Sequence, residues 1–439
     1  MKPVTWRGVL ALALPSMASA VLTNAYRSVD QFWIQDVSVE AQAAIGSSFF
    51  ILIAVYAVFQ LTGMGAAPLI ARATGAGDDA LRRRILSTAI LGTTGLYVLV
   101  AVLLAPISLQ IAESMGLSGQ TAEECSTYLS VLFITGLPFA LTPLVDQCFV
   151  ATGDTRTPMW LQGLSLAVNF VLTPLFIFTF DLGIAGAALA SNGSRLLTTG
   201  LGLWLLMRAT GLSREDLGPS GLDAVQLRRM VAIGAPASAG ILLYAGVYWG
   251  VLKTSVSPLG PEVNAALGIG FSALEGFTWP AFHGVSLAVS SIVGRALGAG
   301  QVDQAWRAIK LGVPMSGVLG LLATAAFIGL GGPLTGIFTD DPLVQQEATT
   351  YAFVLGFSQI FVAYEALTEG VLNGAGDTKG VFWWSVPLNL LRIPGAWFLA
   401  IHLGWGAAGI WWAINATTWV KTVGKGFWVW RGGWARLDV

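Results

Sequence analysis

Long apolar stretches alternate with short polar connections along the whole chain. A helix that crosses a bilayer needs about 20 mainly apolar residues, and every stretch is that long or longer. The pattern therefore predicts an all-α integral membrane protein with twelve transmembrane helices. The expected helices cover roughly residues 8–34, 42–71, 85–110, 124–150, 158–180, 184–207, 231–255, 264–293, 308–331, 345–373, 381–400 and 404–429.

The composition agrees with a bilayer as the solvent. Charged residues make up 11% of the 439 positions and hydrophobic residues 55%, whereas a soluble domain carries roughly 25% charged residues. The net charge of −1 provides no basic field for binding nucleic acid. No GxxxxGK[ST], HExxH or CxxC motif occurs, so we expect no enzyme activity, no bound cofactor and no histidine-based metal site.

Lys and Arg fall almost entirely on one side of the predicted membrane. If the two termini and every second connection share a side, all but four of the 23 Lys and Arg residues lie there, with Lys421 and Lys425 among them. The four others are Arg27, Arg195, Lys253 and Arg392. Because basic loops stay cytoplasmic, we expect a multi-pass protein of the plasma (inner) membrane with both termini inside and no cleaved signal peptide.

The chain repeats itself with an offset of 221–223 residues. The segment ATGDTR (151–156) resembles GAGDTK (374–379), and LGIAGAALA (182–190) resembles LGWGAAGIW (403–411). The offset spans six predicted helices, so the two halves have the same orientation and a pseudo-two-fold axis along the membrane normal is expected. The predicted domains are lobes 1–212 and 230–439, joined by a cytoplasmic linker, 213–229. Duplicated lobes around a cleft are typical of transporters.

Two charges lie in the first expected helix. Ionisable residues within a membrane helix are costly and usually face a cavity or each other. Arg27 and Asp30 stand three positions apart, so one interpretation is an ion pair near the outer interface. The other is that Asp30 takes up a proton or a sodium ion, while Arg27 tunes its proton affinity.

Further candidate residues lie in the second half. Glu275, Trp279 and His283 fall at positions i, i+4 and i+8 of one expected helix. A carboxylate beside an aromatic face suits an organic cation, although a packed Trp279 and a hydrogen-bonded core His283 stay open as alternatives. Glu365 and Glu369 are four residues apart, so we expect one of the two to be protonated in a low dielectric.

Three intramembrane charges have a less specific interpretation. Asp146 is the repeat mate of Glu369, and this pair is interpreted as residues at the headgroup level or as a cytoplasmic gate. Arg195 and Arg392 are expected to be counter-ions, structural residues or part of a gate.

The motifs resemble those of the MATE (multidrug and toxic compound extrusion) family over nearly the whole chain. AYRSVDQFWI (25–34) looks like the family's first-helix pattern, GAGDT (374–378) like its GxGDT loop, and GAALAS (186–191) like its GAAxA(T/S) pattern. The resemblance implies a cation-coupling site that binds a proton or, with oxygen ligands, a sodium ion. Its members are Asp30, Asn169, Thr173 and Ser191.

The resemblance also implies a substrate cavity and a transport cycle. Tyr244 stands where some members carry Glu, so the second sodium site of that subgroup is expected to be absent. The residues expected to line the cavity are Arg27, Arg195, Tyr244, Glu275, Trp279, His283 and Glu365. The implied activity is antiport by a monomer in lipid: a proton or sodium ion moves inward, and an organic, cationic, amphipathic compound moves outward as the lobes rock.

Two other functions remain open. A flippase for lipids or lipid-linked sugars would need a strongly basic cavity, which Arg27, Arg195 and Arg392 favour and the acidic residues oppose. A receptor or scaffold that transports nothing would have a dry interface between its lobes.

Overall fold

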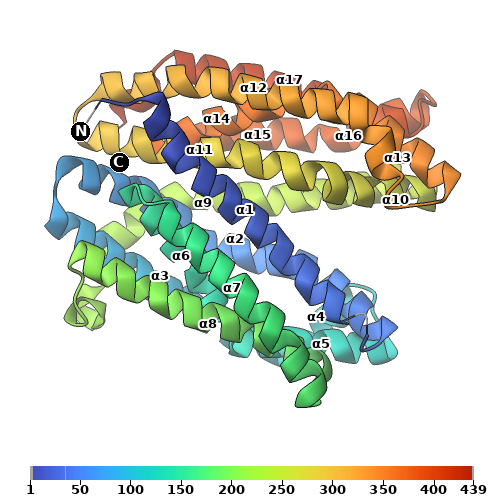
Figure 1. Ribbon diagram of the computed structural model, residues 1–439, viewed down its shortest axis with the longest axis horizontal. Helices are drawn as coiled ribbons and strands as arrows, with labels where there is room; N and C mark the ends of the chain where they lie inside the picture. Colours follow the sequence, from blue (N-terminus) through green and yellow to red (C-terminus); the bar gives the residue numbers. More distant parts are fainter. Residues whose placement is uncertain (1–2, 35, 438–439) are drawn as a thin grey trace. The chain divides into compact units, whose positions relative to one another are not determined.

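The computed structural model describes residues 3–34 and 36–437, apart from the side chains of residues 27, 28, 30, 31, 50, 219, 272 and 273. The described residues form helices and turns without a strand, which confirms the predicted all-α fold (Figure 1). The first half contains α1 (Trp6–Ile34), α2 (Val39–Ala76), α3 (Asp79–Leu104), α4 (Ser108–Ser114), α5 (Gly119–Ile134), α6 (Leu137–Thr152), α7 (Arg156–Pro174) and α8 (Gly183–Thr210).

The second half is broken into more pieces. It contains α9 (Ala224–Val251), α10 (Pro261–Ile269), α11 (Gly276–Gly298), α12 (Val302–Thr335), α13 (Pro342–Gly356), α14 (Gln359–Ala375), α15 (Thr378–Leu390), α16 (Arg392–Trp397) and α17 (Ala407–Trp430). Short π-helical segments extend four helices: η2 (Leu175–Thr179), η5 (Leu252–Val256), η7 (Gly270–Glu275) and η8 (Phe398–His402).

Each of the twelve predicted segments coincides with one helix or with a consecutive group of helices. Within the described residues, 7 helices are long and apolar enough to cross a membrane. Two bent pairs, α5 with α6 and α13 with α14, each turn by 56° and bring this number to 9 if each pair is one span. The remaining predicted segments, 184–207, 381–400 and 404–429, correspond to α8, to α15 through η8, and to α17.

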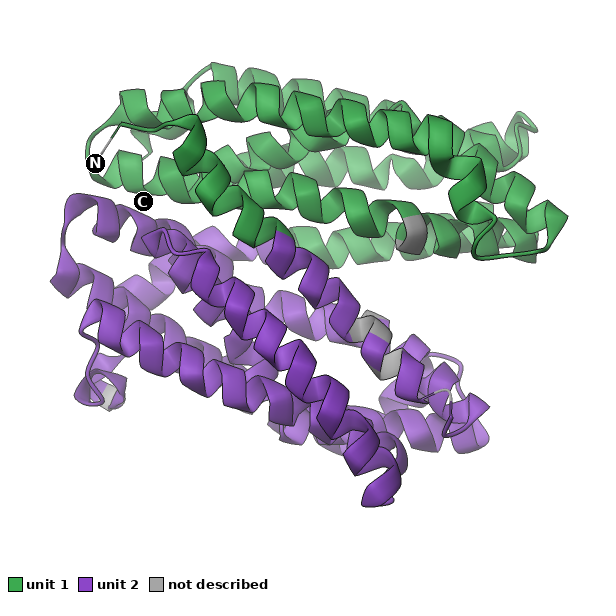
Figure 2. Cartoon of the chain, in the orientation of Figure 1, with its two compact units in different colours: residues 1–17, 239–439 green, residues 18–238 purple. Residues whose placement is uncertain are grey.

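The chain divides into two compact units, residues 18–238 and residues 1–17 with 239–439 (Figure 2). The first helix therefore contributes residues to both units, and α9 begins in one and ends in the other. The lobe limits taken from the repeat stay a prediction. Within the second unit, α14 packs against α11, α12 and α17. Glycines at 370 and 374 permit the close approach to α11, because a Cβ at either would overlap the backbone of Ser286 or Ser290.

The internal repeat is visible in matched contacts at an offset of 223 residues. Gly186 of α8 lies against the backbone of η2, and Gly409 of α17 lies against the backbone of η8. Asn192 donates its side-chain amide to the carbonyl oxygen of Leu132 (3.3 Å), and its counterpart Asn415 donates to the carbonyl oxygen of Val354 (2.6 Å). These contacts shift the alignment of α8 with α17 by two residues from the one that the sequence motif suggested.

The two GDT segments are helix-capping turns. Gly153 and Gly376 end α6 and α14 with φ of 94° and 85°, a left-handed conformation that favours glycine. Asp154 Oδ1 then accepts the backbone N–H of Thr157 at 3.0 Å, and Asp377 Oδ1 accepts that of Gly380 at 3.0 Å. Each motif therefore joins two helices by satisfying the donors of the second one.

The connection between the halves is held against α3. The hydroxyl groups of Ser87 and Thr88 donate to the carbonyl oxygen of Gly221 at 2.9 and 3.3 Å. Asp216 accepts the backbone N–H and the hydroxyl of Ser213, and these hydrogen bonds lower the pKa of its carboxyl. The polar linker thus has its own local structure.

Candidate functional site

A buried polar cluster joins α7 to α8 in the first half. Asn169 donates its side-chain amide to Ser191 Oγ at 3.4 Å, and the hydroxyl of Thr173 donates to the carbonyl oxygen of Asn169 at 2.8 Å. All three side chains are buried. The structure therefore brings together Asn169 and Ser191, two of the four residues expected to couple a cation, with Thr173 one turn away on α7.

The first helix contacts this cluster through Tyr26. Its hydroxyl donates to the carbonyl oxygen of Ser191 at 2.9 Å and lies 2.5 Å from Ser194 Oγ. Sequence reasoning named neither Tyr26 nor Ser194 as a site residue. The available signal was the position of Tyr26, one helical turn before Asp30.

Arg195 lies over aromatic rings. Its guanidinium carbon is 4.4 Å from the centre of the Tyr26 ring and 5.3 Å from that of Phe139. Such cation–π contacts stabilise a cation away from water by roughly 1–2 kcal/mol. Arg195 thereby borders the cluster from its own helix, α8.

Arg27 and Asp30 have side chains outside the described residues. Their backbones belong to α1. The ion pair between them and the coupling role of Asp30 both stay predictions.

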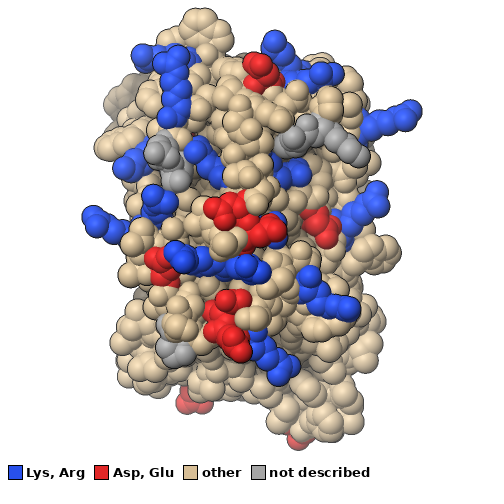
Figure 3. Space-filling model, turned by 90° about the vertical axis from the view of Figure 1, so that its left-hand side faces the viewer, with Lys and Arg blue, Asp and Glu red and all other residues tan. Residues whose placement is uncertain are grey.

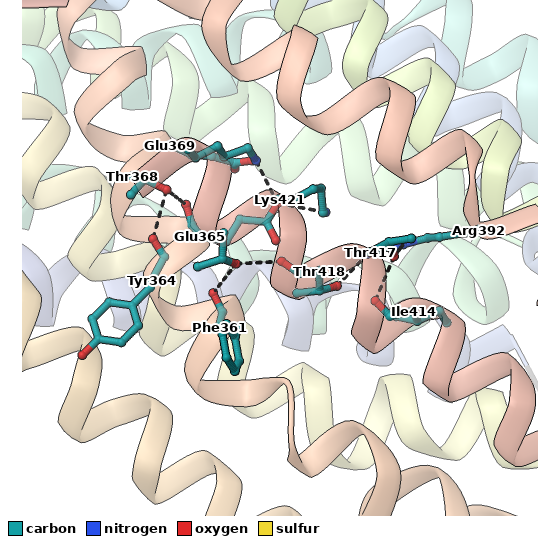
Figure 4. Close-up of polar contacts among 12 residues, drawn as sticks. Phe361, Tyr364, Glu365, Thr368, Glu369, Arg392, Ile414, Thr417, Thr418 and Lys421 are labelled. Atoms are coloured by element: carbon teal, nitrogen blue, oxygen red, sulfur yellow. Dashed lines mark hydrogen bonds and ion pairs between the residues drawn. The ribbon is translucent and has the colours of Figure 1, made fainter. Parts of the chain in front are cut away.

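The second half carries a network of buried and partly buried charges, which we call the charged tetrad: Glu365 and Glu369 of α14, and Lys421 and Lys425 of α17. Figure 4 labels Glu365, Glu369 and Lys421 of this network. Lys421 Nζ and Lys425 Nζ each lie 2.8 Å from Glu365 Oε1, and Lys425 Nζ also contacts Glu369 Oε1. The Lys425 side chain is 0% exposed, and that of Glu369 is 27% exposed.

The charged tetrad corrects one expectation and bears on another. Lys421 and Lys425 were assigned to the basic cytoplasmic side, but both are buried inside the second unit, where α17 packs against α14. One of Glu365 and Glu369 was expected to be protonated; two ammonium groups contact these carboxylates, and the protonation of one of them stays a prediction. The equal four-residue spacing of the two acids and of the two lysines was the signal in the sequence.

Arg392 begins α16 and is buried among hydroxyl groups. Its Nε donates to Thr417 Oγ1 at 3.0 Å, and one terminal nitrogen donates to Thr418 Oγ1 at 2.9 Å. Figure 4 shows this contact on the same helix that carries Lys421. Neutral acceptors therefore hold this cation in place.

The expected aromatic stripe begins where a π-helical turn ends. Trp279 and His283 stack on α11, with ring centres 5.9 Å apart. Glu275 ends η7 and accepts the hydroxyl of Tyr351 at 2.6 Å. The π turn ends at Glu275, whose backbone is in the α-helical region and caps α11, so the four-residue spacing from Glu275 to Trp279 and His283 is kept. Tyr244 of α9 lies against Tyr248, with ring centres 4.8 Å apart.

The oxygen atoms of the first-half cluster suit a small hard cation, but they are neutral. Amide and hydroxyl oxygens are sodium ligands of the kind expected at 169, 173 and 191, and the negative charge would have to come from Asp30. Among the residues that the structure describes, no group of three or more His, Cys, Asp or Glu side chains could hold a metal ion.

Comparisons with known proteins agree over the full length of the chain. The profile of the MatE family matches residues 15–175 and 236–398. The probable multidrug resistance protein NorM of Thermotoga maritima is 25% identical over 452 residues, which cover 100% of this chain and 95% of that protein. The multidrug export protein MepA of Staphylococcus aureus is 24% identical over 421 residues, which cover 94% and 91%.

Solved structures show the same fold. The outward-facing structure of a multidrug resistance MATE family transporter of the MOP superfamily superposes with a TM-score of 0.90 at 19% identity, covering 99% of this chain and 97% of that one. A MOP superfamily transporter from Pyrococcus furiosus gives the same TM-score, identity and coverage.

Proposed function

Because the chain belongs to the MatE family of membrane transporters, we propose that it exports organic, cationic and amphipathic compounds in exchange for an inward proton or sodium ion. The relatives that cover nearly the whole chain are multidrug transporters, which supports small molecules as the substrates. The chain carries no GxxxxGK[ST] motif, so its source of energy in this proposal is an ion gradient rather than a nucleotide.

The buried cluster of the first half is the observation that carries the proposal. It places the amide of Asn169 and the hydroxyl of Ser191 beside Tyr26 of α1. Asp30 follows Tyr26 by four residues, and residues four apart share one face of a helix. In the proposed site, Asp30 supplies the negative charge, and Asn169, Thr173 and Ser191 supply neutral oxygens for a proton-bonded network or a sodium ion.

The proposed substrate contacts lie in the second half. Trp279 is 46% exposed and Tyr244 42%, and exposed aromatic faces attract organic cations. His283 stacks on Trp279, while Glu275 is held by Tyr351. In this proposal the aromatic rings bind the apolar body of the substrate and Glu275 attracts its charge.

The proposed orientation places both termini in the cytoplasm and the monomer as the working unit, with the lobes alternating access. Figure 3 shows Lys and Arg side chains interspersed with Asp and Glu. A basic cytoplasmic surface is the arrangement that insertion into a membrane favours.

Transport of a fluorescent organic cation in liposomes tests the coupling role of Asp30. Purified protein is reconstituted, and export of a fluorescent organic cation is measured under independently imposed pH and sodium gradients. We expect transport by the wild type to follow one of the two gradients and the Asp30→Asn variant to fall to the level of empty liposomes.

The matched control is Asp36→Asn, six residues further along and exposed at the start of the connection to α2. This variant should transport as the wild type does. Undiminished transport by Asp30→Asn, or equal losses in both variants, would contradict the assignment of Asp30.

A further inference from the structure

The charged tetrad has an arrangement that points to a cation site. Glu365 and Glu369 are one turn apart on α14, so their carboxylates face the same neighbouring helix. Lys425 of α17 reaches both, with its Nζ 2.8 Å from Glu365 Oε1 and also in contact with Glu369 Oε1. A single ammonium group therefore bridges two carboxylates and is shielded from solvent.

The fold itself does not require these charges. At the offset of 223 residues, Lys425 corresponds to Gly202 and Glu365 to Thr142. The first half packs the same two helices, α6 and α8, with a glycine and a threonine at these places. A bridging cation is therefore a particular property of the second half.

We propose that Glu365 and Glu369 form a site for one small monovalent cation and that the ammonium of Lys425 occupies it permanently, as an ion tethered to the chain. The second half then needs no free sodium ion or proton to balance these acids. Lys421, whose one carboxylate partner among the described residues is Glu365, supplies the second positive charge and leaves the bridging position to Lys425.

The electrostatics account for a cation at this position. Two carboxylates on one helical turn repel each other, and this repulsion is strong where water is excluded. A cation that contacts both converts the repulsion into two attractions. Removing one partner from a buried ion pair leaves an uncompensated charge, which is strongly destabilising. Truncating Lys425 therefore creates a demand for a free cation, together with a space for it.

The test is chemical rescue of Lys425→Ala by free cations. All variants carry Asp30→Asn, so that an ion bound at the proposed coupling site of the first half makes no contribution. The full-length protein is purified in detergent without sodium, and its thermal unfolding is followed in sodium chloride, methylammonium chloride or choline chloride at equal ionic strength.

We expect Lys425→Ala to show a saturable rise of about 2–4 °C in its unfolding temperature with sodium or methylammonium and no rise with choline. The Asp30→Asn parent, whose site is filled by its own lysine, should not respond. Lys425→Ala should likewise bind radioactive sodium, and the parent should not.

Two controls separate the site from general charge effects. Lys421→Ala keeps the bridging ammonium, so its unfolding temperature should not respond to sodium. Lys425→Ala combined with Glu369→Gln removes one carboxylate together with the lysine, which balances the charge of Lys421 against Glu365 and should abolish the response.

Each remaining outcome overturns the proposal. It is wrong if folded Lys425→Ala ignores both small cations, or if choline stabilises it equally. It is also wrong if Lys425→Ala fails to fold in every cation, because an emptied cation site should accept a free ion. The readout is stability rather than transport, so the proposal stands or falls separately from the coupling role of Asp30.

Discussion

The same position in the two halves of the molecule contains opposite chemistry. In the first half, α6 and α8 present Thr142, Asp146, Thr198 and Gly202. In the second half, α14 and α17 present Glu365, Glu369, Lys421 and Lys425 at an offset of 223 residues. One set is nearly uncharged, and the other contains two acids and two bases.

The first set is held by hydrogen bonds to uncharged partners. Asp146 accepts the side-chain amide of Gln162 at 2.7 Å, and the hydroxyls of Thr142 and Thr199 lie 2.6 Å apart. A cavity of about 10 Å³ borders these side chains, close to the smallest volume that holds a water molecule. In the second set, each lysine is paired with a carboxylate.

The difference shows that duplicating a helix pair determines which positions face each other. It does not determine whether the side chains there form hydrogen bonds or ion pairs. A threonine pair and an amide satisfy one copy, and a charge-balanced tetrad satisfies the other. The predictions below use this contrast, from the largest expected loss of stability to the smallest.

Neutralising the acid shared by both lysines should have the largest effect. Glu365→Gln leaves Lys421 without a carboxylate among the described residues and leaves Lys425 with one. We expect a loss of about 3–5 kcal/mol in the free energy of unfolding, measured by SDS titration in mixed micelles. The matched change in the first half, Thr142→Val, removes one hydroxyl pair and should lose only about 1 kcal/mol. Equal losses would show that the two positions are energetically alike.

Adding a side chain in the first half, where the second half has Lys425, should have an intermediate effect. A Cβ on Gly202 would lie 2.9 Å from Val145 Cγ1 and 3.0 Å from Leu161 Cδ1. We expect Gly202→Ala to lose about 1–3 kcal/mol through overpacking. The control is Gly200→Ala on the same helix, where a Cβ would meet nothing within 4 Å. A harmless Gly202→Ala would mean that packing does not keep side chains out of the first half.

Neutralising Asp146 should have the smallest effect. Asp146→Asn keeps an oxygen that can accept from Gln162, so we expect a change within about 1 kcal/mol. The repeat mate Glu369 contacts an ammonium, so Glu369→Gln should lose about 1.5–3 kcal/mol, as expected for a hydrogen bond to a charged group. Both are measured in the same SDS titration. A larger loss for Asp146→Asn than for Glu369→Gln would reverse the comparison.

The amino-acid sequence predicted the membrane class, the all-α fold and the family, because these depend on long apolar segments and on motifs spread along the chain. It also placed Asp146 and Glu369 at equivalent positions. It misplaced Lys421 and Lys425, because a side-counting rule assigns each lysine near the end of a segment to the loop. Only the packing of α14 against α17 shows that both lysines point into the protein and pair with Glu365 and Glu369.

The candidate site could be predicted from the sequence only in part, because some of its contacts depend on helix packing. Asn169 and Ser191 came from motifs, and the structure brings them together. Tyr26 lies in the first-helix motif, which did not single it out, and Ser194 lies in no quoted motif. Their contact depends on how α1 meets α8. The stripe of Glu275, Trp279 and His283 came from helical spacing, and the π-helical segment η7 ends at its first residue.

The bridging lysine also limits the order in which such a network can arise through single substitutions. An arrangement with one buried acid, as at Asp146 in the first half, can accept a lysine opposite it, because the new charge finds a partner at once. A second acid at the position of Glu365 and a second lysine at that of Lys421 can follow as another pair. The reverse order, with both acids first, would leave an intermediate with two buried negative charges and no cation. The mutational history of the second half is therefore constrained by charge balance at every step.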